Sequence, residues 1–480
     1  MNIPVLVGAA TSEQWPEGPG DGVGCEELLV DAAIGAIANA GADATLSEMV
    51  DLVLVTQGLS MLADGAQRIA AAIGRPDARA VTYQVGIPQQ TLLSRAIEAV
   101  RSGEARAVVV AGAETKRRDD LARRADATLD RPEPHAEPDE LVVPKGEIVA
   151  RPEVEIRAVM PVQQYALIDS ARRAANGWSL DGHRDDIAAV WAGFNEVAQT
   201  NPKAAFPTPM SAVNIREPSD TNRMLAFPYN KWHNSQWAVD QAAAFVITST
   251  ELADSCGVDP DRRVFPHVGL ESSHSLSLSR RADLHRWPAM AVLGRAAVSH
   301  SGRPLSTVEH VELYSCFPAA VRVQQAELGL DLAASATITG GMAFAGGPFN
   351  NFVFQATVAM IERLRADPGS MGLVTAVSGL LTKPGLALWS TDAPPSGVMV
   401  SDLVDDARAA TTVAALDEHP SGDGSVATYT VVGERIVAII DLDSGERAVA
   451  ALDDAVSAAD ACQSELIGTR VRVNGLKFGI

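Results

Sequence analysis

The residue types best suited to chemistry lie in residues 311–321, VELYSCFPAAV, which contain Tyr314, Ser315 and Cys316. The stretch opens with apolar and polar residues in alternation, as in a strand, and Pro318 suits the first position of a helix. A thiol at a strand-to-helix junction faces backbone N–H groups without partners, so we expect a lowered pKa and a nucleophilic or basic Cys316. The alternative is a small buried hydrophobe, because free cysteine is among the most buried residue types.

The composition is that of a globular protein with several domains. The chain has 480 residues, of which 47% are hydrophobic and 21% charged, and its formal net charge is −21. So acidic a chain is a poor partner for nucleic acid or an anionic membrane, both of which bind basic faces. The sequence shows no signal-peptide pattern and no apolar run of membrane-spanning length. The cysteines have neither metal-ligand spacing nor a disulfide pattern, so we expect a soluble, cytoplasmic protein without a metal site; they are Cys25, Cys256, Cys316 and Cys462.

Short apolar runs alternate with helical periodicity through the first 111 residues. Strands are expected at residues 5–9, 52–56, 80–85 and 107–111, and helices at 26–40, 67–73 and 92–101. This alternation predicts a mostly parallel sheet that is covered by helices on both faces. The charged, proline-rich sequence of residues 116–140 and the isolated helical pattern at 162–175 indicate a long insertion with its own helical subdomain.

The α/β pattern returns at residue 239, where we expect a helix that leads into a strand. It continues with a helix at 352–364 and a strand at 372–377. Residues 89–114 and 349–379 share one plan, in which a polar start, an amphipathic helix, a glycine-containing turn and an apolar strand follow one another. Two copies of one unit predict two similar halves, whose helix N-termini would converge on one site that favours anions and thiolates.

The last eighty residues have a different pattern of expected secondary structure. Short strands are expected at 412–416, 425–432, 436–441, 448–451 and 469–473, with a helical patch at 454–464. Five strands and one small helix suggest a compact β-barrel of the OB type. Residues 401–480 hold 14 acidic and 6 basic side chains, whereas a nucleic-acid groove would be basic and lined with aromatic residues.

Several stretches, in order along the chain, resemble the thiolase superfamily. They are AGAE at 111–114, FPYNKWHNSQWAVDQAAA at 227–244, RADLHRWPA at 281–289, VELYSCFP at 311–318 and TGGMAFAGGPFNN at 339–351. The likeness is to sterol-carrier-protein-type thiolases, to actinobacterial relatives named acetyl-CoA acetyltransferases, and to type 1 thiolase-like proteins with an additional C-terminal domain. The resemblance implies an α/β thiolase fold, with two βαβ-rich halves in αβαβα layers. Its domains would be an N-terminal half at 1–115 and 230–255, a loop-domain insertion at 116–229, a C-terminal half at 256–393 and an OB-like domain at 398–480.

The resemblance also implies that key catalytic side chains are missing. The family's nucleophilic cysteine falls at Gly86, and its Asn-Glu-Ala-Phe or His-Asp-Cys-Phe motif falls at 314–317, with Tyr314 at the Asn or His position. The Gly-His-Pro motif reads as glycine, glycine and proline at 346–348, and the Cys-x-Gly motif leaves Ser378 as its polar candidate. Claisen chemistry needs a thiolate and a base, so ordinary thiolase turnover is not expected. The catalytic candidates are Cys316 and Tyr314, and the expected pocket wall is Gly86, Ser315, Gly346, Gly347 and Ser378.

Three functions remain open at this stage. One is an acyl-CoA-binding protein of the acyltransferase class without ordinary thiolase activity, and another is a retro-aldolase-type carbon–carbon lyase that uses Tyr314 and Cys316. The third is a non-enzymatic protein that binds acyl-CoA or docks a protein partner through its C-terminal domain, as a monomer or homodimer. A coenzyme A thioester is the expected ligand, and no covalently bound cofactor is expected. The resemblance places Lys116, Arg117, Arg118 and His233 near coenzyme A, although a solvated charged face and a structural histidine are the alternatives.

Overall fold

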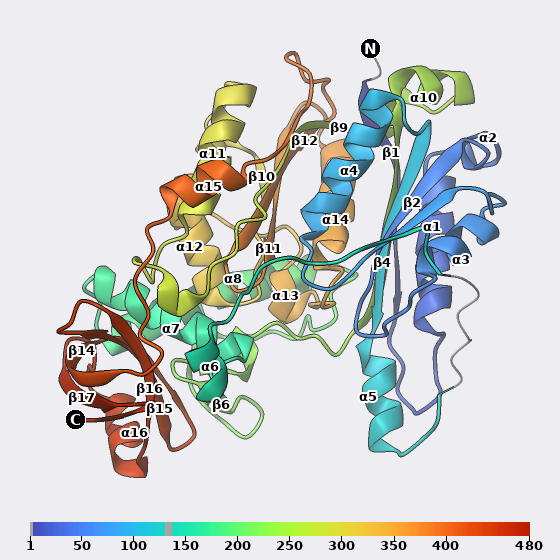
Figure 1. Cartoon of the computed structure of the whole chain (residues 1–480). Coiled ribbons are helices and arrows are strands. Elements are labelled where there is room, and N and C mark those ends of the chain that lie inside the picture. The colour runs from blue at the N-terminus through green and yellow to red at the C-terminus, as the bar shows by residue number, and fades with distance from the viewer. Residues whose placement is uncertain (1–2, 130–136) are drawn as a thin grey trace.

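A computed structural model describes residues 3–129 and 137–480 of the chain (Figure 1). Residues 130–136, part of the charged stretch in the expected insertion, lie outside the described residues. Two mixed sheets and a separate closed barrel form the framework. In the described part of the chain, no helix is both long and apolar enough to cross a bilayer.

The first sheet carries most of the N-terminal residues. Strand β8 runs antiparallel to both of its neighbours, β1 and β4, whereas the other three pairs are parallel. Helices α1 (Cys25–Asn39) and α3 (Gly65–Ala72) cover one face of this sheet, and α4 (Gln89–Ser102) covers the other. The strand order is β1 (Pro4–Gln14), β8 (Asp240–Ser249), β4 (Ala107–Thr115), β2 (Val50–Thr56), β3 (Arg79–Tyr83) and β5 (Glu140–Val142).

The second sheet repeats this plan on the other side of α4. Helices α4 and α14 (Phe352–Ala366) pack between the two sheets, and α11 (Pro288–Ser301) packs on the outer side of the second (Figure 1). The expected αβαβα layers are therefore confirmed. The strand order is β10 (His310–Glu312), β11 (Met371–Ser378), β12 (Lys383–Ser390), β9 (Phe265–Glu271) and β13 (Met399–Asp402).

The segment between β4 and β8 is largely helical and supports the barrel. The closed barrel has the order β14 (Ser421–Val432), β15 (Arg435–Leu442), β16 (Arg447–Asp453), β18 (Lys477–Gly479) and β17 (Arg470–Asn474). Helix α7 (Pro161–Ala175) packs against β14, and Phe227 belongs to the hydrophobic core of the barrel. The remaining elements of this segment are α5 (Lys116–Arg124), α6 (Arg151–Glu155), α8 (Leu180–Thr200), α9 (Ala212–Arg216), β6 (Met224–Ala226) and β7 (Tyr229–Asn230).

Two sequence-based expectations about the fold were wrong. The helix expected to begin at residue 239 is strand β8, because an alanine-rich run fits between two neighbouring strands when both faces are covered. The strand expected at 412–416 makes only isolated bridges, at Val413 and Leu416, and β18 completes the barrel instead. The expectation of a mostly parallel sheet holds for the first sheet, where only the pairs of β8 are antiparallel, whereas β12 of the second sheet runs antiparallel to both neighbours.

Candidate functional site

Cys316 lies in the loop between β10 and helix α12 (Pro318–Leu328), as expected, with Pro318 at the first helical position. Its side chain is 8% exposed and is hydrogen-bonded to the Tyr165 hydroxyl, which comes from α7. Burial raises the pKa of the thiol to about 12, so the expected lowered pKa was wrong. The backbone N–H groups of Phe317 and Cys316 do lower the pKa, as expected at a helix start, but burial outweighs them. Cys316 therefore carries its proton at neutral pH.

Tyr314 and Ser315 are fixed by neighbouring elements. Tyr314 N donates to Thr375 Oγ1 on β11 at 2.9 Å, and the Tyr314 ring meets the Phe352 ring edge to face, with centroids 5.8 Å apart. Burial, followed by the nearby Cys316, raises the pKa of the Tyr314 hydroxyl, so this group is a neutral hydrogen-bond donor. Ser315 Oγ accepts from Met342 N at 3.0 Å and thus fastens the loop to the glycine-rich segment.

Gly86 is hydrogen-bonded to Ser378 and to Lys383, a residue that the sequence did not single out. The Gly86 carbonyl oxygen accepts from Ser378 Oγ at 2.9 Å and from Lys383 Nζ. Gly86 has φ +100°, and a Cβ there would lie 3.2 Å from Pro144, so glycine suits both the backbone and the space. Lys383 is 4% exposed, and burial lowers its pKa. A lysine that opens the apolar run of β12 was the available sequence signal.

Gly346 and Gly347 lie close to neighbouring segments of the chain. Gly346 has φ +108° and lines a cavity of about 310 Å³ that runs beside α14. Gly347 N donates to Gln236 O at 3.0 Å, and a Cβ at Gly347 would lie 1.9 Å from Ser235 Oγ. Because Ser235 N also donates to Cys316 O at 3.0 Å, this segment joins the glycine loop to the Cys316 loop.

The N-termini of the two central helices meet as the internal repeat predicts. Gln89 Oε1, at the start of α4, accepts from Val353 N, at the start of α14, at 2.7 Å. Gly86 directly precedes α4, and Tyr314 packs on Phe352 at the start of α14. The structure thus brings Gly86, Ser378 and Tyr314 to one junction, with the Cys316 and Gly346–Gly347 loops beside it.

His233 is buried beside this junction and acts as a cap. Its Nδ1 accepts from Asn230 N at 3.1 Å, and its Nε2 is buried without a partner in the described part of the chain. Burial lowers the pKa of His233 to about 3, so the ring is neutral. The ring lies 5.9 Å from that of Tyr229, whose hydroxyl donates to the buried Asp169. These contacts fit the structural alternative for His233.

The three basic residues expected near coenzyme A begin helix α5, and the side chains of Lys116 and Arg117 already have protein partners, whereas Arg118 Nε is buried without a hydrogen-bond partner among the described residues. Lys116 pairs with Asp120, and the Arg117 guanidinium lies 3.8 Å from the centre of the Trp15 ring. The backbone N–H groups of Arg117 and Arg118 donate to the Asp240 carboxylate. Lys116 Nζ also lies 5.3 Å from the centre of the Trp237 ring. Trp237 directly follows Gln236, whose carbonyl oxygen accepts from Gly347 N. Among the described residues, no cluster of His, Cys, Asp and Glu could hold a metal ion.

Comparison with solved structures shows which known proteins share this fold. A monomeric SCP2-thiolase-like protein type 1 from Mycobacterium smegmatis aligns over 98% of this chain and 97% of its own, with TM-score 0.84 and 26% identity. This chain has a thiolase-like fold. No protein-family model and no curated protein sequence matches it.

Two further structures share the thiolase-like fold at lower identity. Human mitochondrial 3-ketoacyl-CoA thiolase, solved in complex with CoA, aligns over 82% of this chain and 98% of its own, at 15% identity and TM-score 0.57. An Ltp2–ChsH2(DUF35) aldolase aligns over 81% of this chain and 98% of its own, at 18% identity and TM-score 0.54.

Proposed function

We propose that this protein binds a coenzyme A thioester at the junction of α4, α12 and α14 and does not carry out cysteine-dependent thiolase condensation. The observation that carries the loss of condensation is that, among the described residues, no thiolate lies where the central helices meet. Gly86 precedes α4, and the nearby Cys316 thiol is buried with a pKa of about 12. The human thiolase solved with CoA supports the ligand class.

The expected loss of turnover follows from the chemistry. Thioester condensation by a cysteine enzyme forms a covalent acyl intermediate on a thiolate, and a base must then deprotonate the second substrate. Glycine at 86 offers no atom for the first step, and Gly347 leaves no imidazole at the expected base position. Loss of one such group typically lowers the rate by orders of magnitude.

Two measurements test the proposal. Calorimetry with CoA and with acetyl-CoA should show saturable binding, and no binding of either compound would disprove the ligand class. Intact-mass spectrometry after incubation with acetyl-CoA should show no acetyl adduct. A stable adduct that disappears in Cys316→Ala would overturn the claim that no acyl-enzyme forms.

A second candidate is retro-aldol cleavage of a β-hydroxyacyl thioester by Tyr314 and Cys316. Tyr314 supports it, because its neutral hydroxyl can hydrogen-bond a carbonyl oxygen, and one structural neighbour is an aldolase. Cleavage that is lost in Tyr314→Phe and retained in Tyr83→Phe, a buried tyrosine of β3, would favour this candidate. Unchanged cleavage in Tyr314→Phe would remove the role of Tyr314.

The barrel is the proposed docking surface for a protein partner, in a cytoplasmic monomer or homodimer. The aldolase neighbour contains a DUF35 component, which supports a partner-binding role for an added domain. If calorimetry shows thioester binding without any turnover, the non-enzymatic alternative is favoured. Sedimentation of the full chain measures its oligomeric state directly.

A further inference from the structure

Ser378 and Lys383 lie opposite each other at the end of the hairpin that β11 and β12 form. The register pairs the two residues directly, so both side chains leave the same face of the sheet. Ser378 Oγ donates to the Gly86 carbonyl oxygen at 2.9 Å, and Lys383 Nζ donates to the same oxygen. One backbone acceptor thus has two side-chain donors, and Ser378 alone satisfies it when the amine turns to another partner.

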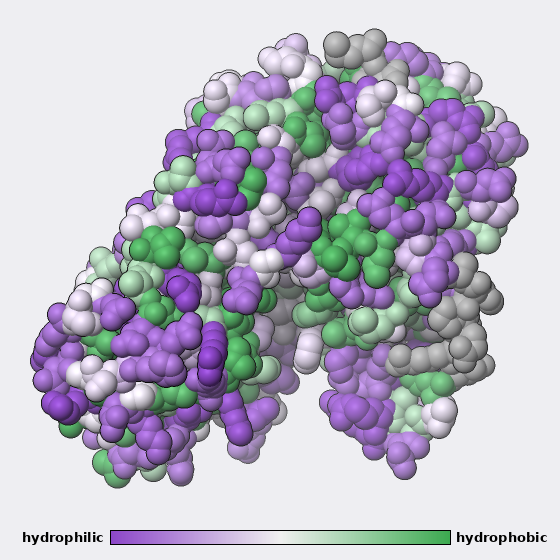
Figure 2. Space-filling model, viewed as in Figure 1, coloured by the Kyte–Doolittle hydropathy of each residue, from purple (hydrophilic) through white to green (hydrophobic). Residues whose placement is uncertain are grey.

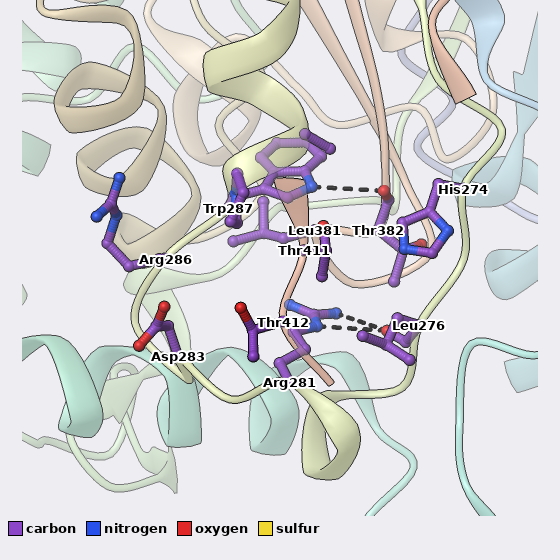
Figure 3. Close-up of a pocket in the computed structure, with 12 residues that line it drawn as sticks. His274, Leu276, Arg281, Asp283, Arg286, Trp287, Leu381, Thr382, Thr411 and Thr412 are labelled. Carbon is purple, nitrogen blue, oxygen red and sulfur yellow. Dashed lines mark hydrogen bonds between the residues drawn. The ribbon is translucent and has the colours of Figure 1, made fainter. Parts of the chain in front are cut away.

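The turn that joins these two strands has an unusual backbone. Leu380 and Leu381 have φ +62° and +56°, in the left-handed region where glycine or asparagine is usual. Arg281 Nη2 donates to the Leu380 carbonyl at 2.6 Å. The Trp287 indole N–H donates to the Thr382 carbonyl at 3.4 Å (Figure 3). Backbone strain of this kind persists where neighbouring groups hold it, and it is frequent at functional sites.

Lys383 has a buried amine with no acid beside it. The residue is 4% exposed, and the Gly86 carbonyl is the only acceptor for Nζ among the described residues. Burial is the one effect that shifts the pKa of Lys383, which it lowers, so no charged group in the described ranges acts on it strongly. Glu271 of the neighbouring strand β9 also faces α4, but its carboxylate accepts from the Thr91 hydroxyl.

The missing counter-charge distinguishes a bound anion from water at Lys383. A buried cation without a compensating anion is unfavourable. A water molecule can accept a hydrogen bond from the amine, but it leaves the charge unbalanced. A carboxylate does both, and hydrogen bonds between ionised partners are among the strong ones in proteins.

The segment at 144–148 covers this place and is lightly attached. A Cβ at Gly86 would lie 3.2 Å from Pro144, and a Cβ at Gly379, in the hairpin turn, would lie 2.6 Å from Ile148. Among the described residues, one hydrogen bond holds the segment, in which a serine hydroxyl of the loop after β9 donates to its backbone at 2.6 Å. Displacement of so short a segment would open a path to the amine.

We propose that Lys383 binds a carboxylate on the acyl group of the thioester, so that the site prefers monothioesters of dicarboxylic acids, such as malonyl-CoA. This inference rests on the proposed binding of a CoA thioester at the α4–α12–α14 junction. Gly86 precedes α4, and the N-termini of α4 and α14, which meet there, also favour negative charge. A carboxylate beside Gly86 would balance the charge of Lys383 while Ser378 holds the Gly86 carbonyl.

Calorimetry with malonyl-CoA and acetoacetyl-CoA tests the preference, because the two acyl groups have nearly the same shape and differ in the terminal carboxylate. The wild type should bind malonyl-CoA at least about tenfold more tightly, as expected for a hydrogen bond between charged groups. Lys383→Met should lose this preference and keep its affinity for acetoacetyl-CoA. Lys145→Met, at an exposed lysine of the covering segment, is the matched control and should keep the preference.

Crystals of the full chain grown with malonyl-CoA give a second measurement that needs no variant. A carboxylate oxygen within hydrogen-bonding distance of Lys383 Nζ is the expected result. A carboxylate bound elsewhere, or a folded Lys383→Met variant that keeps the preference, would overturn the proposal. Saturable binding of both esters with equal affinity to the wild type disproves only the role of Lys383. If neither ester nor CoA itself binds, the thioester site as a whole is disproved.

Discussion

Cys316 lies two residues before helix α12, and protein surrounds its thiol on the α7 side, where the Tyr165 hydroxyl is hydrogen-bonded to it. Desolvation disfavours the thiolate, whereas the Tyr165 bond favours it. Desolvation is the larger effect, so position at a helix start does not by itself make a cysteine reactive. A thiol of this kind can line a ligand pocket without acting as a nucleophile.

Cys316 should consequently be alkylated slowly. A pKa of about 12, against an ordinary 9.0, leaves about a thousandfold less thiolate at pH 8. Iodoacetamide labelling followed by peptide mass spectrometry should modify Cys316 at least about tenfold more slowly than the half-buried Cys256. Tyr165→Phe removes the bond that favours the thiolate and should slow the reaction further. Faster labelling of Cys316 than of Cys256 would contradict this account.

His233 should contribute to the acid sensitivity of the fold. Its folded-state pKa of about 3 lies below its ordinary 6.5, so the unfolded chain binds the extra proton between these values. Stability from this group is therefore complete above pH 6.5 and is lost as the pH falls toward 3, with a slope of up to about 1.4 kcal/mol per pH unit. In His233→Gln, urea unfolding at pH 4, 5, 6 and 7 should show a shallower dependence on pH. Parallel curves for the two proteins would refute the assignment.

At the scale of elements, α7 connects the candidate site to the barrel. Tyr165 on one side of α7 reaches Cys316, and Thr428 of β14 donates to the Leu167 carbonyl at 2.5 Å. Arg173, near the end of α7, is 1% exposed, pairs with Glu465 and lies 5.8 Å from the Tyr429 ring. The same helix thus takes part in both the pocket wall and the barrel interface.

Removal of the acid from this interface should cost stability. Glu465→Gln leaves the buried Arg173 charge without its partner, and because Glu465 is half-exposed we expect a loss of about 1–2 kcal/mol in the free energy of unfolding. Asp443→Asn, which breaks a fully exposed pair with Arg470 on the same barrel, is the matched control and should change little. Equal effects of the two substitutions in denaturant titrations would show that the Arg173–Glu465 pair contributes no more to stability than an exposed ion pair.

How far the sequence predicts these features depends on how local the signals are. Helices α4 and α12 could be predicted because their apolar spacing and the terminal glycines Gly103 and Gly329 are signals within the element. Strand β8 could not, since its alanine run favours a helix until neighbouring strands cover it. Lys383 was missed because its partner Gly86 lies 297 residues away in the sequence.

At the scale of the whole molecule, the barrel is built into the rest of the chain. On the face that Figure 2 shows, the barrel and α5 project from the body with a notch between them. The barrel nevertheless takes part of its core from outside, because Phe227 is 4% exposed and stacks 6.4 Å from the Tyr429 ring. Thr430 donates to the Phe227 carbonyl at 2.8 Å, and Arg435 donates to the Ile156 carbonyl at 2.7 Å.

This shared core should make unfolding of the full chain a single cooperative event. Phe227→Ala removes a large side chain from the barrel core, and such truncations typically cost about 3–5 kcal/mol. Because the lost contacts join the barrel to the segment before β8, calorimetry should show one transition in the wild type and an earlier, separate barrel transition in the variant. Phe349→Ala, at a more exposed phenylalanine away from the barrel, should keep a single transition. Two transitions in the wild type would mean that the barrel folds independently, and its interface with α7 would then be a docking contact between separate units.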